Sequence, residues 1–79
     1  MGANMTYQNM IRITTDYLGP AAPRFIDRQI EGHLGKNPQD INKRDVDALV
    51  EWLSVSLSHL TDDQSVVKEY ADRLHKLSS

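Results

Sequence analysis

Apolar residues recur at every third or fourth position along most of this chain. In the first such segment, one helical face would carry Tyr7, Met10, Thr14, Tyr17 and Leu18. Residues 10–15 are also rich in β-branched side chains, which favour strands, but no second segment offers a strand to pair with them. We therefore predict a helix from about Met5 to Leu18.

Gly19 and Pro20 separate this helix from a second one. Glycine adopts the left-handed backbone that closes helices, and proline suits the first turn of the next helix. The second helix is predicted over residues 21–34, with Gly35 as its end. Its apolar face comprises Ala22, Phe25, Ile26, Ile30, His33 and Leu34. We accordingly expect His33 to be a partly buried, hydrogen-bonded core histidine.

The third predicted helix has a well-marked start. Asn42 and Asp45 have the spacing of a capping box, and Ile41 and Val46 have the spacing of a hydrophobic staple. The helix should continue to about His59 or Leu60. Its main apolar stripe consists of Val46, Leu49, Val50, Leu53, Leu57 and Leu60.

A second capping box is predicted at residues 61–64, which places Thr61 at the cap of a fourth helix ending near Leu77. The apolar face of this helix comprises Val66, Val67, Tyr70, Ala71, Leu74 and Leu77. Four short amphipathic helices joined by tight turns predict an all-α, compact bundle with the third helix central. Residues 1–4 are expected to form a flexible tail and residues 5–79 a single helical-bundle domain.

The third helix carries a second apolar set, separated by four, three and four residues: Ala48, Trp52, Val55 and His59. A surface helix ordinarily has one apolar stripe. Either the other helices cover both stripes, or the second set is exposed and binds a partner or a second copy of the chain. The latter reading follows from the enrichment of tryptophan at binding hot spots and of exposed apolar patches at interfaces.

Arg24 and Arg28 lie one turn apart on the polar face of the second helix. Asp27 and Glu31 interleave with them, so the local charge nearly cancels. This pattern is typical of a solvated face with ion pairs along the helix. The alternative is a docking face for an acidic partner.

Length and charge limit the classes of function. The 79 residues allow one domain with a modest core. Nine basic and eleven acidic residues give a net charge of −2, which argues against nucleic acid as the main partner and against a basic membrane-surface helix. Cysteine is absent, which excludes disulfides and thiolate chemistry. No apolar run is long enough for a membrane span and no signal peptide is visible, so we expect a cytoplasmic protein.

Candidate catalytic groups do not form a recognisable pattern. His33, His59 and His75 fall on three different predicted helices, without the spacing of a zinc site. His33 and His75 match the surroundings of a phosphorelay histidine only loosely. No serine has a histidine base beside it, and no glycine-rich phosphate loop is present. We expect neither enzymatic activity nor a cofactor or metal ion.

A DNA-associated regulator is the alternative, because the third and fourth helices are joined by a short turn of the helix-turn-helix kind. The basic residues of the fourth helix are Lys68, Arg73 and Lys76. Glu69 and Asp72 offset them, so nucleic-acid binding is disfavoured.

The sequence Tyr-Leu-Gly-Pro-Ala-Ala at residues 17–22, with Asp-Val-Asp-Ala-Leu at residues 45–49, resembles a small helical module of bacterial signalling proteins. That module sits beside kinase, forkhead-associated or response-regulator domains. The resemblance implies regulation or scaffolding and supplies no catalytic residues. We therefore predict a non-catalytic interaction or regulatory module that acts through a helical face. Its partner would be another protein or, in a homodimer, a second copy.

Overall fold

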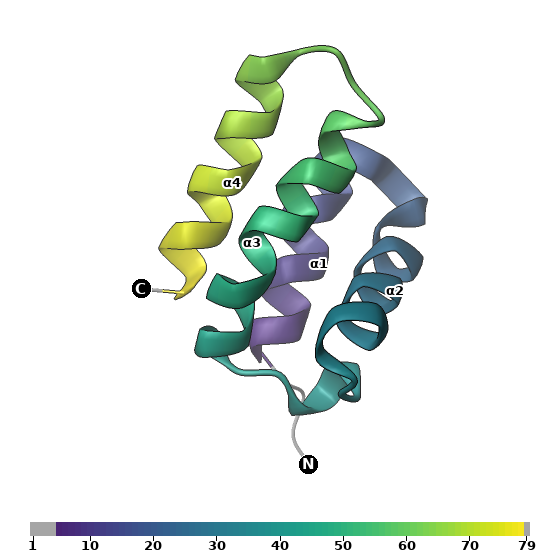
Figure 1. Ribbon diagram of the computed structural model, residues 1–79, viewed down its shortest axis with the longest axis vertical. Coiled ribbons are helices and arrows are strands. Elements are labelled where there is room, and N and C mark those ends of the chain that lie inside the picture. The colour runs from purple at the N-terminus through teal and green to yellow at the C-terminus, as the bar shows by residue number, and fades with distance from the viewer. Residues whose placement is uncertain (1–4, 79) are drawn as a thin grey trace.

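The computed structural model describes residues 5–78, which fold into four α-helices (Figure 1). The helices are α1 (Met5–Leu18), α2 (Ala22–Leu34), α3 (Lys43–Ser58) and α4 (Gln64–Ser78). Short 3-10 turns lie at Gly19–Ala21 and Pro38–Asp40, and residues 5–78 contain no strand. The predicted all-α fold is confirmed. The predicted tail, residues 1–4, lies outside the described residues. None of the helices in the described range is long and apolar enough to cross a bilayer.

The helices pack as a bundle in which α3 lies between α2 and α4, with α1 behind it (Figure 1). α3 packs mainly on α4 and α2, while α1 packs mainly on α2 and α4. The largest share of buried residues in any helix comes from α3: Val46, Leu49, Val50, Leu53 and Leu57. α3 is therefore central to the core, although its opposite face reaches the surface.

One hydrophobic cluster draws on all four helices. Its buried members are Met10, Ile26, Ile30, Ile41, Val46, Leu49, Val50, Leu53, Leu57, Tyr70 and Leu74. A polar contact lies within it, where the hydroxyls of Thr14 and Tyr70 are 2.8 Å apart and both residues are fully buried. Burial raises the pKa of Tyr70 to about 12, since the ionised ring would lose its hydration. The bond lets α1 and α4 bury two hydroxyls without leaving either one unpaired.

The predicted capping box at the start of α3 is confirmed. The side-chain oxygen of Asn42 accepts a hydrogen bond from the Asp45 N–H at 3.0 Å, and the Asp45 carboxylate accepts one from the Asn42 N–H at 3.0 Å. Burial by itself raises the pKa of Asp45. The Lys36 ammonium 2.9 Å away and the Asn42 N–H together lower this pKa by more than burial raises it, so the net shift is downward. Ile41 and Val46 are both buried in the core cluster, as a hydrophobic staple requires.

The predicted cap of the fourth helix is wrong. α4 begins at Gln64, and its cap is Asp63, whose carboxylate accepts hydrogen bonds from the N–H groups of Ser65 at 2.9 Å and Val66 at 3.4 Å. The hydroxyl of Thr61 instead accepts a hydrogen bond from the Asp63 N–H at 3.2 Å. Because α3 ends at Ser58, the chain needs the residues up to Asp63 to reverse direction before a new helix can start.

Two residues predicted for the core are at the surface. His33 lies in the last turn of α2 and is exposed, since its ring rests on the outer face of α3 rather than beneath it. Leu60 is 62% exposed, because α3 ends before it and the helical repeat no longer sets its direction. Both side chains join the surface described next.

Candidate functional site

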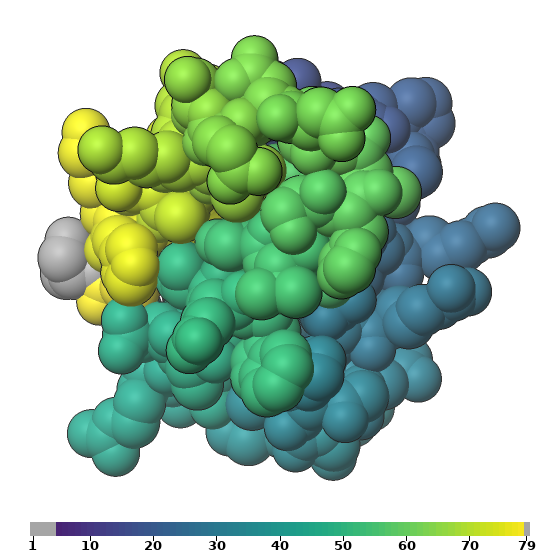
Figure 2. Space-filling model, turned by 45° about the horizontal axis from the view of Figure 1, so that its top comes forward, coloured from purple at the N-terminus to yellow at the C-terminus, as the bar shows by residue number. Residues whose placement is uncertain are grey.

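The second apolar set of α3 is at the surface of the molecule. Trp52 is 51% exposed and Val55 47% exposed, and Ala48 and His59 are exposed as well. The interpretation in which neighbouring helices cover this set is therefore wrong. Figure 2 shows the green surface of α3 in open view beside the blue to teal surface of α2.

α2 and α3 present facing rows of side chains that run in opposite chain directions. The rings of His33 and Trp52 stack, with centroids 4.4 Å apart and planes 13° apart. One turn further, Gln29 and Ser56 line a hollow between the two helices, and one turn beyond them, Phe25 and Leu60 line that hollow as well. His33 and Trp52 lie next to this hollow along the helices and are not part of its lining. All of these residues, with Arg24, Arg28 and Val55, form what we call the α2–α3 surface.

Exposed large apolar side chains gather on the α2–α3 surface rather than scatter. Within residues 5–78 the large apolar residues with high exposure are Met5, Trp52, Val55 and Leu60. All but Met5 belong to the α2–α3 surface. Single exposed apolar residues are ordinary, whereas several on neighbouring turns of one helix and its end enlarge the apolar part of one face.

Between the two helices lies an open hollow of about 300 Å³, lined by Ala21, Arg24, Phe25, Arg28, Gln29, Ser56 and Leu60. Pockets for small-molecule ligands span about 300–1,000 Å³ and enclose most of their ligand. This hollow is at the lower limit and open to solvent, so it would not enclose most of a small-molecule ligand. The Gln29 side-chain oxygen beside it is buried and has no hydrogen-bond partner in the described part of the chain.

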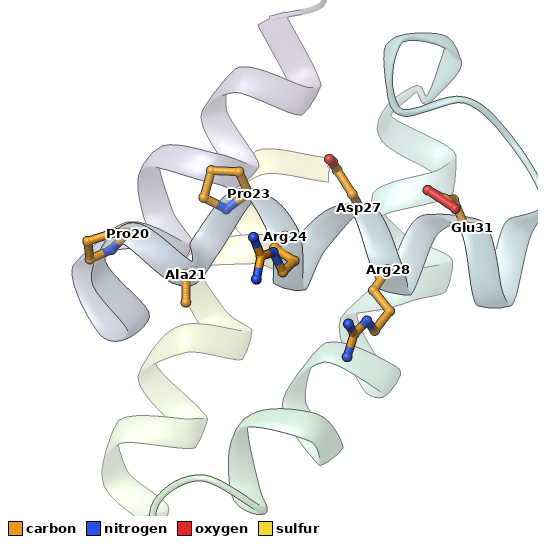
Figure 3. Close-up of a pocket in the computed structure, with 7 residues that line it drawn as sticks. All are labelled: Pro20, Ala21, Pro23, Arg24, Asp27, Arg28 and Glu31. Carbon is orange, nitrogen blue, oxygen red and sulfur yellow. The ribbon is translucent and has the colours of Figure 1, made fainter.

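Arg24 and Arg28, singled out from the sequence, lie at the edge of this hollow. Figure 3 shows them extending toward one side of α2, while Asp27 and Glu31 extend toward the other. Asp27 accepts a hydrogen bond from the Tyr7 hydroxyl at 2.5 Å. Burial of that hydroxyl, together with the Asp27 carboxylate, raises the pKa of Tyr7 to about 12. Neither arginine has an acidic group within 4.0 Å among residues 5–78, so the predicted ion pairs along this helix are wrong.

A larger hollow lies on the outer side of α2 (Figure 3), lined by Pro20, Ala21, Pro23, Arg24, Asp27, Arg28 and Glu31. All of these residues come from α2 and the turn before it, so no second helix supplies an opposing wall. A small molecule there would touch protein on one side only, which is insufficient for a ligand pocket. The hollow instead leaves the side chains of Arg24 and Arg28 open to solvent on this side of α2 as well.

The histidines and carboxylates lie in separate places. His33 is stacked on Trp52, His59 follows the last residue of α3, and His75 has its Nδ1 3.6 Å from the Asp47 carboxylate on the exposed side of the bundle. No group of three potential metal ligands comes together among residues 5–78. The arrangement that the structure does assemble is an apolar strip with two arginines at its edge.

Comparison with protein-family models, curated proteins and solved structures finds no match. The resemblance of residues 17–22 and 45–49 to a signalling module therefore stays a prediction. The candidate site rests on the geometry of the α2–α3 surface alone.

Proposed function

We propose that this chain is a non-catalytic protein-binding module that docks another protein through the α2–α3 surface. The observation that carries the proposal is the joint exposure of Trp52, Val55 and Leu60 on one face of the bundle. Removing apolar area from water is favourable by about 25 cal/mol per Å², before the entropic cost of association is subtracted. Tryptophan is among the residues that most often dominate binding energy. A regulatory or scaffolding role in the cytoplasm belongs to the same proposal.

The chemistry around the hollow supports binding over catalysis. Its polar groups are two guanidinium groups, an amide and the Ser56 hydroxyl. An enzyme needs a nucleophile or an acid/base pair that converges on one point. The nearby Asp27 instead extends to the other side of α2, where Tyr7 engages it.

The DNA-binding alternative has less support. Asp16 pairs with the Arg73 guanidinium at 2.8 Å, and that guanidinium also lies over the Tyr17 ring, 5.6 Å from its centroid. Arg73 is thereby engaged within the bundle, on the helix that would have to enter a DNA groove. Salt-dependent binding to duplex DNA in a fluorescence anisotropy titration would favour this alternative instead.

Site-specific photo-crosslinking in the native cells tests the proposal. A photoreactive residue at position 55 should yield a discrete adduct, whereas one at exposed position 72 of α4 should not. Trp52→Asp should abolish the adduct, and Met5→Asp, which alters an exposed apolar residue away from this surface, should preserve it. Circular dichroism melts would verify that both variants fold. Equal labelling from positions 55 and 72 would refute the proposal.

A further inference from the structure

The charges on the α2–α3 surface point to the kind of partner. Arg24 and Arg28 edge the apolar hollow and have no ion pair in the described structure, although the whole chain carries a net charge of −2. No acidic residue lines the hollow with them. The hollow between α2 and α3 is thus lined by two basic and no acidic side chains, on a protein whose net charge is negative.

Asp27 and Glu31 line the larger hollow on the outer side of α2 together with Arg24 and Arg28, but neither acid forms an ion pair with these arginines. Asp27 is held by the Tyr7 hydroxyl, and Asp27 and Glu31 both extend away from the side that Arg24 and Arg28 occupy (Figure 3). An arginine presents a planar fork of donors that matches a carboxylate. Two such forks one helical turn apart match two carboxylates that are likewise one turn apart.

The apolar part of the surface has the same helical spacing. Phe25 and Leu60 line one end, and Trp52 stacks against His33 at the other end, two turns along α2. Eight residues of helix correspond to about 12 Å at 1.5 Å per residue. Two turns of a partner helix cover that length, with apolar side chains three or four positions apart.

We propose that the α2–α3 surface binds an acidic amphipathic helix, with apolar side chains over Phe25, Trp52 and Leu60 and carboxylates paired with Arg24 and Arg28. This inference rests on the proposed function and names its partner class. The contact is smaller than standard protein interfaces of about 800 Å² per partner, so we expect micromolar or weaker affinity.

A second copy of the chain fits this surface less well. A two-fold interface brings the same patch of both copies together. It would place Arg24 and Arg28 of each copy at an interface whose hollow offers them no acid. Like charges brought together in this way oppose association.

The test uses the complete chain and three synthetic peptides of about 15 residues that contain no tryptophan. The first is an amphipathic helix with leucine every third or fourth position and a glutamate stripe. The second has lysine in place of glutamate, and the third has the composition of the first in scrambled order. Trp52, the single tryptophan of the chain, reports binding by fluorescence.

We expect the acidic amphipathic peptide to bind and the other two to bind at least about tenfold more weakly. Binding should weaken as NaCl rises from about 0.05 to 0.5 M. Arg24→Glu combined with Arg28→Glu should reverse the preference, so that the lysine peptide binds better. Arg12→Glu with Lys68→Glu, on α1 and α4, makes the same change in net charge elsewhere and should leave binding unchanged.

Equal binding of the acidic and lysine peptides, or of the scrambled peptide, would overturn the acidic-helix inference. So would sedimentation showing a dimer that Trp52→Asp dissociates, since a second copy would then occupy the surface. If no peptide binds at millimolar concentration while the adduct at position 55 persists, this inference fails and the proposed function stands. If no peptide binds and no adduct forms at position 55, both the acidic-helix inference and the proposed function are overturned.

Discussion

The imidazole of His33 lies flat against the indole of Trp52, with ring centroids 4.4 Å apart and planes inclined by 13°. The contact joins the last turn of α2 to the middle of α3 at the surface of the bundle. Both residues remain exposed, so each ring covers one face of the other while the outer faces meet solvent. The stack fixes the orientation of the residue on which the proposed binding most depends.

His33→Ala should therefore cost little stability. A stacked aromatic pair contributes about 0.5–1.5 kcal/mol, whereas removing a large buried core side chain costs about 2–5 kcal/mol. We expect a loss of no more than about 1.5 kcal/mol in urea denaturation. The emission of Trp52 should shift to longer wavelength, because water reaches the uncovered ring face.

His75→Ala is the matched control. His75 is also exposed, but it lies on α4, away from the α2–α3 surface, with its Nδ1 near the Asp47 carboxylate. It should leave the Trp52 emission unchanged. If His33→Ala instead lowered the free energy of unfolding by about 2 kcal/mol or more, His33 would be a core residue, as the helical pattern predicts.

The repeat of apolar residues was sufficient to predict the helices and most of the core, because burial of one helical face is a local property of the sequence. It failed at His33 and Leu60, which lie at or beyond the ends of helices. There the position of a residue on the helical wheel no longer determines whether its side chain packs in the core. From the sequence pattern, Trp52 and Arg28 were members of two separate candidate interaction faces. Their placement on one surface depends on how α2 packs on α3, and the spacing within one helix does not encode that.

Asp62 and Asp63 provide a matched pair for the start of α4. Only Asp63 accepts hydrogen bonds from the first N–H groups of the helix, those of Ser65 and Val66. Asp63→Ala should lower the free energy of unfolding by about 1 kcal/mol, the usual value of a helix cap. Asp62→Ala should change it by less than about 0.5 kcal/mol, as is usual for exposed positions. Equal losses in thermal denaturation would contradict this assignment.

Gln29→Met tests the buried amide beside the hollow. The Gln29 oxygen has no hydrogen-bond partner within residues 5–78, and burying an unpaired polar group costs about 1–3 kcal/mol. Methionine has a similar length and no amide to desolvate, so the variant should be as stable as the original or up to about 1 kcal/mol more stable. Gln8→Met, at an exposed site on α1, should be neutral. A loss above about 1 kcal/mol would indicate that the amide is satisfied.

The buried pair Thr14 and Tyr70 should behave asymmetrically when either hydroxyl is removed. After Tyr70→Phe, the threonine hydroxyl can turn to the carbonyl four residues earlier in its own helix. After Thr14→Val, the tyrosine hydroxyl loses its 2.8 Å partner within the core. We expect losses of about 1 and about 2 kcal/mol, respectively. The double variant should cost less than the sum, and strict additivity in the mutant cycle would refute the coupling.

Alkaline pH should destabilise the fold through Tyr70. Its pKa is raised from 10.0 to about 12 in the folded chain, chiefly by burial, whereas in the unfolded chain the ring ionises near 10. Between these values the folded state binds more protons than the unfolded state, so the free energy of unfolding falls as pH rises. The stabilisation is fully present below pH 10 and is lost by about pH 12. Two pKa units correspond to about 2.7 kcal/mol, an upper value for the loss.

Urea denaturation at a series of pH values from 8 to 12 measures this dependence. Tyr70→Phe removes the ionisable group and should flatten the decline, whereas Tyr7→Phe should leave the part due to Tyr70 in place. Tyr7 is the necessary comparison because its pKa is also raised to about 12, by burial and by Asp27. Its hydroxyl is only partly buried, so solvent screens that contribution more strongly. An unchanged decline in Tyr70→Phe would show that another group carries the alkaline sensitivity.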